Sequence, residues 1–385
     1  MLNEKIRRVC LIQLHDAWGA CEEYWRLLAG GIDPERFAVS VLYPDGEEVR
    51  SQFAQLPPWV QQRPCPRFWF QSLRSGIGPL RQALVRLGPD LVHCNDPGLV
   101  AMIAGVLARV PVRVLTFHTP AQAFEYRFYA RWLQRWVLRR WQVVALSPTN
   151  RQLLQRRYGL ANERVHTIAH GLESDRFSIA NRRDAVRAEL AVPPDCILLG
   201  CVARLAAQKN HALLLDAYAG LTLGLRSRAH LLIVGDGELR AELEAQVKQL
   251  GLCDRVTFTG HRQDIPQLLQ AMDGFVLSSN YEGLPFAVLE AMAMALPVVA
   301  TAVDGVCDAI VSGETGFLVP PGEEEPLRDA IAQLIENPEA RNRLGNAGRA
   351  RFLSHYTVER MVRETETLYE TLLANQPQSL GRVRS

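Results

Sequence analysis

Two glutamates and two basic residues in the second half of this chain have the types and spacing to bind a charged, elongated ligand. Glu282 precedes an expected helix and Glu290 lies within it, with seven residues between them. At a rise of about 1.5 Å per residue, the two carboxylates can reach different parts of one ligand. Arg204 and Lys209 follow an apolar run at the expected start of another helix. Two cations beside a helix N-terminus suit a diphosphate, since Arg offers a forked donor and Lys a point charge.

The residues around Glu282 favour a ligand site over an ordinary helix end. Gly283 allows a close approach of the backbone, and Pro285 suits the first helical turn because no donor is needed there. The N–H groups at such a helix start form an anion or hydroxyl site. A lone glutamate pair is more often an acidic helix start with a solvent-facing side chain, but Arg204 and Lys209 argue against that interpretation. A glycosidase-like displacement by two carboxylates is disfavoured because Glu290 lies inside a helix.

The elements that position these residues alternate between short apolar runs and longer amphipathic segments, which is typical of parallel sheets covered by helices. Strands are predicted at 9–14, 37–43, 91–94, 112–117, 143–146, 165–168, 197–203, 230–234, 256–259, 274–277 and 297–300. Because the pattern restarts near residue 197, two doubly wound α/β units are expected, with ligands at the carboxyl ends of their strands. The region 337–374 has a helical pattern.

Length and charge agree with two globular domains. The chain has 385 residues, 48% of them hydrophobic and 22% charged, which disfavours disorder, a collagen-like chain and a coiled coil. The net charge of +2 conceals an asymmetry: residues 1–190 hold 26 Lys and Arg against 17 Asp and Glu, and the rest hold 17 against 24. The only lysines are Lys5, Lys209 and Lys248. With so few in the chain, a lysine five residues after Arg204 is less expected by chance.

Eight cysteines without metal-type spacing, no signal-peptide core and no apolar run of bilayer length predict a cytoplasmic protein.

Further motifs occur with these residues in a consistent order. They are Gly235-Asp-Gly237, Glu282-Gly-Leu-Pro285, Pro297-Val-Val-Ala-Thr301 and Thr315-Gly-Phe-Leu-Val-Pro320, with Thr116-Phe-His118 and His170–Phe177 in the first half. With them the sequence resembles the retaining GT-B glycosyltransferases of the family 4-like group, whose signature is two glutamates separated by seven residues. The resemblance covers nearly the whole chain. It implies two Rossmann-like domains that face each other across a cleft.

The resemblance assigns a domain plan and residue roles. It implies an N-terminal acceptor-side domain (1–178), a linker (179–194), a nucleotide-sugar-binding domain (195–355), a C-terminal helix (356–374) packing back on the first domain, and a flexible tail (375–385). The implied catalytic residues are His118, near the transferred sugar, with Glu282, Arg204 and Lys209. The implied donor-binding residues are Gly19, Arg204, Lys209, Gly235, Gly283, Leu284, Pro285, Phe286 and Glu290. Glu290 would bind the ribose, and the two cations the diphosphate.

The implied reaction is transfer of a sugar, with retention, from a UDP- or GDP-sugar to a hydroxyl of a glycan or lipid-linked acceptor. Fixed cations and N–H dipoles would stabilise the departing phosphate, so no metal and no cofactor are expected. Two alternatives stay open: a nucleotide-sugar-binding protein without transferase activity, and a GT-B-shaped nucleotide-sugar epimerase. A phosphorylase is disfavoured, because no lysine context for pyridoxal phosphate is recognisable.

Several positions depart from the family pattern. Asp304-Gly305 replaces a customary glycine pair, Asp308 a customary glutamate and Ala295 a glycine, while the loop at Gly19 lacks paired glycines. We interpret these as changes in loop shape or sugar preference.

A basic and aromatic segment in the first half predicts a contact on the acceptor or membrane side. Arginines recur every four residues at Arg127, Arg131, Arg135 and Arg139, with Trp132 and Trp136 between them. Such a helix suits anionic lipid headgroups at the inner face of the membrane. An ordinary surface helix, whose Trp and Leu residues pack on the sheet while its arginines face water, is the alternative. No nucleic-acid partner is expected, because no RNA-binding signature is present.

Overall fold

The computed structural model describes residues 6–14, 20–71, 73–96, 98–118, 128–178, 182–193 and 195–376, with only the backbone at 20, 21, 71 and 128–131. The chain divides into two units. Met1–Gly171 with Val358–Ser385 form unit 1, and Leu172–Thr357 form unit 2. Each unit has its own parallel sheet, so the prediction of two successive α/β folds is confirmed.

The strands of unit 1 are mostly buried apolar runs, as expected for a parallel sheet with helices on its faces. In the described residues they are β1 (Arg7–Ile12), β2 (Phe37–Pro44), β3 (Gln61–Cys65), β4 (Leu91–Asn95), β5 (Val112–Phe117), β6 (Gln142–Ala145) and β7 (Val165–Thr167). They pair in parallel in the order β3-β2-β1-β4-β5-β6-β7. The direction of winding reverses between β1 and β4, which is where doubly wound sheets hold ligands.

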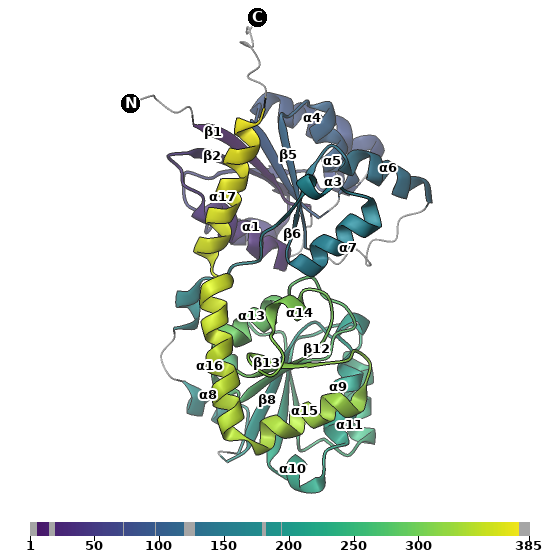
Figure 1. The fold of residues 1–385 in the computed structure, drawn as a ribbon, viewed down its shortest axis with the longest axis vertical. Helices are drawn as coiled ribbons and strands as arrows, with labels where there is room; N and C mark the ends of the chain where they lie inside the picture. The colour runs from purple at the N-terminus through teal and green to yellow at the C-terminus, as the bar shows by residue number, and fades with distance from the viewer. Residues whose placement is uncertain are drawn as a thin grey trace, which may run out of the picture. The chain divides into compact units, whose positions relative to one another are not determined.

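The helices of unit 1 pack in two groups (Figure 1). Helix α1 contacts α2 and α17, whereas α4 contacts α3 and α5, and α5 contacts α6. Their bounds are α1 (Ala20–Gly31), α2 (Glu47–Phe53), α3 (Phe68–Gln71), α4 (Leu73–Leu87), α5 (Leu99–Leu107), α6 (Phe128–Leu138), α7 (Pro148–Tyr158) and α17 (Val358–Ala374), with a 3₁₀ turn, η2 (Asn162–Arg164).

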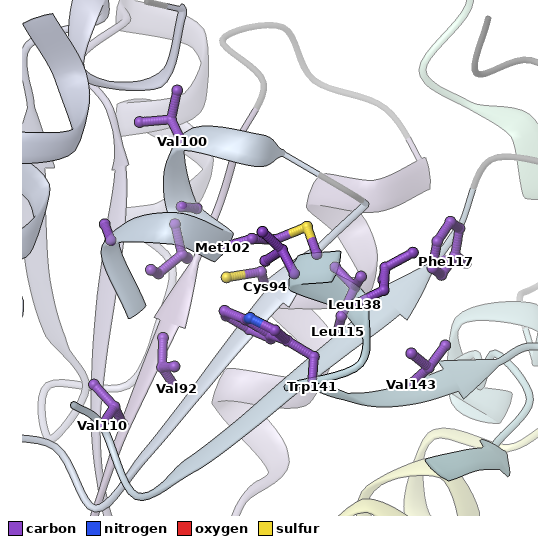
Figure 2. Close-up of a cluster of buried hydrophobic side chains, with 14 of the residues drawn as sticks. Val92, Cys94, Val100, Met102, Val110, Leu115, Phe117, Leu138, Trp141 and Val143 are labelled. Carbon is purple, nitrogen blue, oxygen red and sulfur yellow. The ribbon is translucent and has the colours of Figure 1, made fainter. Parts of the chain in front are cut away.

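A hydrophobic cluster joins the sheet of unit 1 to α4, α5 and α6. Side chains alternate between the two faces of a strand, so Cys10 and Ile12 of β1 share a face and join this cluster. Trp141 is fully buried in it, and Figure 2 shows its ring among side chains that include Leu138 and Val92.

The C-terminal helix α17 belongs to the core of unit 1. Its Tyr369 is fully buried, and the ring packs edge-on against Phe37 at the start of β2. Its Glu366 accepts a hydrogen bond from the backbone N–H of Asp33 at 2.7 Å and pairs with Arg36 at 2.8 Å. These contacts fix α17 beside α1, although more than 300 residues separate the two helices in sequence.

Unit 2 repeats the same topology. Its described strands are β8 (Ile197–Val202), β9 (Ala229–Val234), β10 (Val256–Gly260), β11 (Gly274–Leu277), β12 (Val298–Thr301) and β13 (Gly316–Val319), in the order β10-β9-β8-β11-β12-β13. Its helices are α8 (Arg183–Glu189), α9 (His211–Ala219), α10 (Leu223–Ser227), α11 (Arg240–Gln249), α12 (Ile265–Ala271), α13 (Phe286–Ala293), α14 (Val306–Ala309), α15 (Glu324–Glu336) and α16 (Pro338–His355), with η3 (Ser174–Phe177) and η4 (Ala207–Lys209). The winding reverses between β8 and β11.

The boundaries between the units differ in detail from those expected. Residues 172–177, expected in the first domain, belong to unit 2: Leu172 N–H donates to Tyr356 O at 2.9 Å, and the Phe177 ring packs against Phe352. The segment 179–194, expected as a linker, contains α8, whose Arg183 donates to Asp273 at 2.6 Å.

The helical region 337–374 contains two helices, and they lie in different units. Helix α16 ends at His355 in unit 2, and α17 begins at Val358 in unit 1.

Candidate functional site

Three loops meet at the carboxyl edge of the sheet in unit 2. They follow β8, β11 and β12, which are neighbours in that sheet. The first two flank the switch point, where a crevice forms in doubly wound folds. The predicted residues Arg204 and Lys209 lie in the first loop, and Glu282 in the second. The topology therefore brings the loop of Glu282 beside that of Arg204 and Lys209, more than 70 positions earlier in the sequence.

A buried ion pair joins the first two loops. Lys209 Nζ lies 2.6 Å from Glu282 Oε1, and the Glu282 side chain is only 5% exposed. Ser279 Oγ donates to the same oxygen at 2.6 Å. In the described part of the chain, both bonds to this carboxylate fall on Oε1, which leaves Oε2 as the oxygen for a ligand. Lys209 has three N–H donors, so it can hold Glu282 and an anion at the same time.

Backbone contacts fix the position of this pair. Ser278 Oγ donates to Lys209 O at 3.1 Å and to Asn210 O at 2.9 Å, and Gln208 Nε2 donates to Tyr281 O at 3.0 Å. The N-cap of α9 is Asn210, whose side chain accepts from Leu213 N–H. The two loops thus form one hydrogen-bonded layer above the switch point.

Two glycines hold the Arg204 loop against the loop after β9. Gly235 has a φ of +134°, and a Cβ on it would meet Ala203 O at 2.1 Å. A Cβ on Gly237 would meet Leu205 O at 2.4 Å. Because no larger residue fits at either position, the pair permits a close approach that fixes the backbone on both sides of Arg204. The Arg204 side chain is exposed.

Helix α13 follows Glu282 directly. Pro285, expected in the first helical turn, is instead the N-cap that precedes it, and the helix runs from Phe286 to Ala293 with Glu290 half-buried inside it. Gly283 and Leu284 are buried before it. Helix α13 therefore begins at the layer that carries Lys209, and its N-terminal N–H groups favour an anion there.

The loop after β12 adds a residue whose contact the sequence did not reveal. Asp304 Oδ2 accepts a hydrogen bond from Glu282 N–H at 3.1 Å, and Thr301 Oγ1 donates to Ser279 O at 2.6 Å. Ser279 was equally missed, although it lies three residues before Glu282 at the end of a predicted strand.

The candidate residue of unit 1, His118, lies just after β5 and is buried. Its backbone N–H donates to Asp96 Oδ1 at 2.8 Å. Its ring stacks on His170, with centroids 5.1 Å apart, and meets the Tyr24 ring edge-on at 4.6 Å. The imidazole is therefore held in orientation by α1 and by the segment after β7.

A second histidine connects this region to α17. His93 Nδ1 lies 2.5 Å from Tyr369 Oη, and His93 Nε2 lies 2.7 Å from Thr116 Oγ1, two residues before His118. Burial, reinforced by nearby His118, holds the pKa of both His93 and His170 well below the usual value. These rings are neutral at physiological pH.

The basic aromatic segment presents its tryptophans to solvent. Trp132 is 69% exposed and Trp136 41%, and the Arg140 guanidinium lies 3.7 Å from the centroid of the Trp136 ring. Arg135 and Arg139 are exposed as well. The alternative of an ordinary surface helix holds in part: Val137, Leu138 and Trp141 are fully buried, whereas Trp132 and Trp136 do not pack in the interior.

Three of the predicted site residues are not fully described by the structure. Gly19 and Arg127 lie outside the described residues, as does the side chain of Arg131. Over the described ranges, no group of three or more His, Cys, Asp or Glu side chains is arranged to hold a metal ion. Among the helices described, none has both the length and the apolar character to cross a membrane.

Comparison with known proteins identifies the family. The model of the family described as Glycosyl transferases group 1 matches residues 182–351, and that of Glycosyltransferase Family 4 matches residues 21–176. The alpha-D-kanosaminyltransferase of Streptomyces kanamyceticus is 35% identical over 270 residues, 66% of this chain and 69% of that protein. The chain belongs to the group 1, family 4 glycosyltransferases. The resemblance stated from the motifs is thereby confirmed, and this member is a transferase.

This glycosyltransferase is also similar to two more distant proteins, one by sequence and one by structure. The UDP-Gal:alpha-D-GlcNAc-diphosphoundecaprenol alpha-1,3-galactosyltransferase of Escherichia coli is 26% identical over 298 residues, 74% of this chain and 76% of that protein. A crystal structure of HepE from Anabaena, in complex with UDP and glucose, superposes with a TM-score of 0.82 at 23% identity, covering 95% of this chain and 100% of that one. The GT-B fold is therefore confirmed.

Proposed function

We propose that this glycosyltransferase moves a sugar from a UDP- or GDP-sugar to a hydroxyl of a glycan or lipid-linked acceptor, in the synthesis of a cell-surface polysaccharide or glycolipid. The observation that carries the proposal is the buried Lys209–Glu282 pair at the switch point, beside Arg204 and the start of α13. Two similar proteins support the donor and acceptor classes: HepE, whose crystal structure holds UDP and glucose, and the galactosyltransferase that acts on a diphosphoundecaprenol acceptor.

In the proposed reaction, the main task of the protein is to stabilise the departing diphosphate with fixed positive charge. As the bond from the anomeric carbon to the phosphate breaks, negative charge grows on the diphosphate and positive charge on the sugar. Arg204 and Lys209 stabilise the first, together with the N-terminus of α13. Glu282, through Oε2, and His118 position the sugar, and Glu290 holds the ribose. With both cations in place the reaction proceeds without a metal and with retention, the acceptor attacking from the face that the phosphate leaves.

Turnover of a panel of UDP- and GDP-sugars tests this proposal. Wild type is expected to release free nucleotide from one donor, with activity retained in EDTA, and Arg204→Ala is expected to lower kcat by about 10²-fold with a smaller change in KM. Nucleotide binding without turnover on any acceptor would favour the inactive binding protein, and a change in the free sugar nucleotide itself would favour the epimerase. Proton NMR of the product then gives its anomeric configuration, and inversion would refute retention.

We further propose that the exposed face of α6 docks the enzyme on anionic lipid at the inner membrane surface. Trp132 and Trp136 would insert at the headgroup level while Arg135 and Arg139 meet lipid phosphates, at about 1 kcal/mol per cation. Liposome flotation tests this: binding is expected to phosphatidylglycerol vesicles and not to phosphatidylcholine. Trp132→Ala is expected to weaken it, whereas Leu223→Ala, at a 77% exposed leucine of unit 2, serves as the matched control. Equal binding to both lipids would contradict the proposal.

A further inference from the structure

Four helices of unit 1 form a surface layer without an acidic residue. Helices α3, α4, α5 and α6 pack side by side in this order and cover one face of the sheet (Figure 1). Their sequences contain five arginines and no Asp or Glu, so the layer is positively charged. Large apolar side chains are also exposed on these helices, namely Phe68, Leu73, Val85, Leu107, Trp132 and Trp136. Arginines beside exposed apolar side chains favour contact with an anionic amphiphile.

A cavity of about 790 Å³ lies in this layer, between the C-terminal ends of α4 and α5. This volume is in the range of ordinary ligand pockets. Helices α4, α5 and α6 each lead into a strand of the parallel sheet, so their C-terminal ends lie at its amino edge. His118 follows β5 at the carboxyl edge. The cavity is therefore at the opposite end of the sheet from the candidate residue of this unit.

Two arginines, Arg81 and Arg109, line this cavity. Both are exposed, and within the part of the chain that the structure describes neither forms an ion pair. Arg81 Nε donates to Leu107 O at 3.3 Å, which leaves the terminal N–H groups of its fork for a ligand. The carboxylate of Asp90, shortly after α4, pairs with Arg8 instead and accepts its backbone N–H at 2.9 Å. The cavity therefore offers uncompensated positive charge, and two guanidinium forks suit a phosphate.

The other walls of the cavity are apolar. Val85 of α4 is 55% exposed and Leu107 of α5 is 51% exposed, and Val106 and Pro111 continue the same lining. The helix dipole alone accounts for cations at these helix ends, but it does not account for an apolar-walled cavity between them. A ligand with an anionic head and an aliphatic chain matches both parts of the cavity.

We propose that this cavity binds one molecule of an anionic membrane phospholipid, with the phosphate on the two arginines and part of an acyl chain on the apolar walls. The membrane is the source of the ligand because the cavity continues into the face of α6. Arg113 donates to Val110 O, which lines the cavity, and its Nε donates to Arg140 O, just after α6, at 3.0 Å. The inference rests on the docking proposed for α6, and it adds a discrete lipid site to that surface.

Soluble short-chain lipids test this site separately from the membrane surface. Calorimetry measures binding of dihexanoyl-phosphatidylglycerol and dihexanoyl-phosphatidylcholine below their micelle concentrations, and of glycerol phosphate and inorganic phosphate, which lack chains. Arg81→Gln removes one guanidinium. Arg109→Gly removes the other and suits the φ of +55° at this position, so it should fold at least as well as wild type. Arg156→Gln, at an exposed arginine in the last turn of α7, is the matched control.

Wild type is expected to bind the phosphatidylglycerol at least about tenfold more tightly than the phosphatidylcholine or either chain-free phosphate. Arg81→Gln and Arg109→Gly should each lose about tenfold, while Arg156→Gln and Trp132→Ala bind like wild type. Equal binding of the two lipids, binding of inorganic phosphate as tight as that of the lipid, or unchanged binding in both cavity variants would overturn the inference. A wild type that binds the soluble lipid but transfers no sugar would refute the proposed reaction and support the lipid site.

Discussion

Replacement of Lys209 by methionine is expected to destabilise unit 2 even when no ligand is present. Lys209→Met keeps most of the aliphatic stem and removes the ammonium group. Glu282, 5% exposed, then keeps Ser279 as a donor but loses its counter-ion. The loss should therefore appear as lower stability of unit 2, independent of any effect on catalysis.

The size of this loss follows from the burial of the pair. Removing one partner of a fully buried ion pair costs about 3–5 kcal/mol. Here Lys209 is 19% exposed and Ser279 still donates to the carboxylate, so we expect about 2–3 kcal/mol. For a domain of this size, that lowers Tm by about 5–10 °C.

Thermal unfolding of four proteins tests the reasoning: wild type, Lys209→Met, Glu282→Gln and the double variant. The double variant should recover about 1–2 kcal/mol relative to the sum of the single changes, because it leaves no unpaired charge. Lys248→Met, at an exposed lysine of α11, is the matched control and should change stability by less than about 0.5 kcal/mol. Stability of Lys209→Met equal to that of Lys248→Met, or strict additivity in the double variant, would refute the reasoning.

Three further predictions concern catalysis, backbone strain and pH. Glu290→Ala should raise the donor KM more than it lowers kcat, because ribose contacts are alike in ground and transition states; an unchanged KM in steady-state kinetics would contradict its role. Ala295→Gly should stabilise unit 2 by about 1 kcal/mol in thermal unfolding, since Ala295 has a φ of +56°, and a loss of stability would contradict this. Because the pKa of His93 and of His170 is depressed in the folded state, the unfolded chain binds more protons below about pH 6.5. The free energy of unfolding of unit 1 should therefore fall by about 3 kcal/mol from pH 7.5 to 5.5. An unfolding free energy that does not change over this pH range would contradict the claim that both imidazoles are neutral in the folded state.

The central strands of both sheets were predictable because they are continuous apolar runs. The two strands that were missed, β3 (Gln61–Cys65) and β13 (Gly316–Val319), lie at sheet edges. An edge strand pairs on one side only, and β3, whose middle residues are largely exposed, carries no apolar run to mark it. Over 337–374 the helical pattern alone marks no break, whereas the domain plan implied by the resemblance begins the last helix at 356, two residues before Val358.

The candidate site was predictable to the level of loops. Lys209 and Glu282 were placed after their strands, and a doubly wound topology makes those strands neighbours, but only the structure shows that the side chains pair. Asp304 was noted as a departure from a family pattern, while its hydrogen bond to Glu282 depends on a left-handed backbone that sequence spacing does not encode. The Tyr369–His93 contact spans 276 residues and had no local signal.

The central claim is that Arg204 and Lys209 bind the diphosphate of a nucleotide donor. Calorimetry with UDP and UMP, or GDP and GMP, tests it most directly. Wild type is expected to bind the diphosphate at least about tenfold more tightly than the monophosphate, and Arg204→Ala and Lys209→Met should each lose about tenfold for the diphosphate while binding the monophosphate nearly as before. Equal affinity of wild type for the two nucleotides, or diphosphate binding unchanged in both variants, would contradict the account.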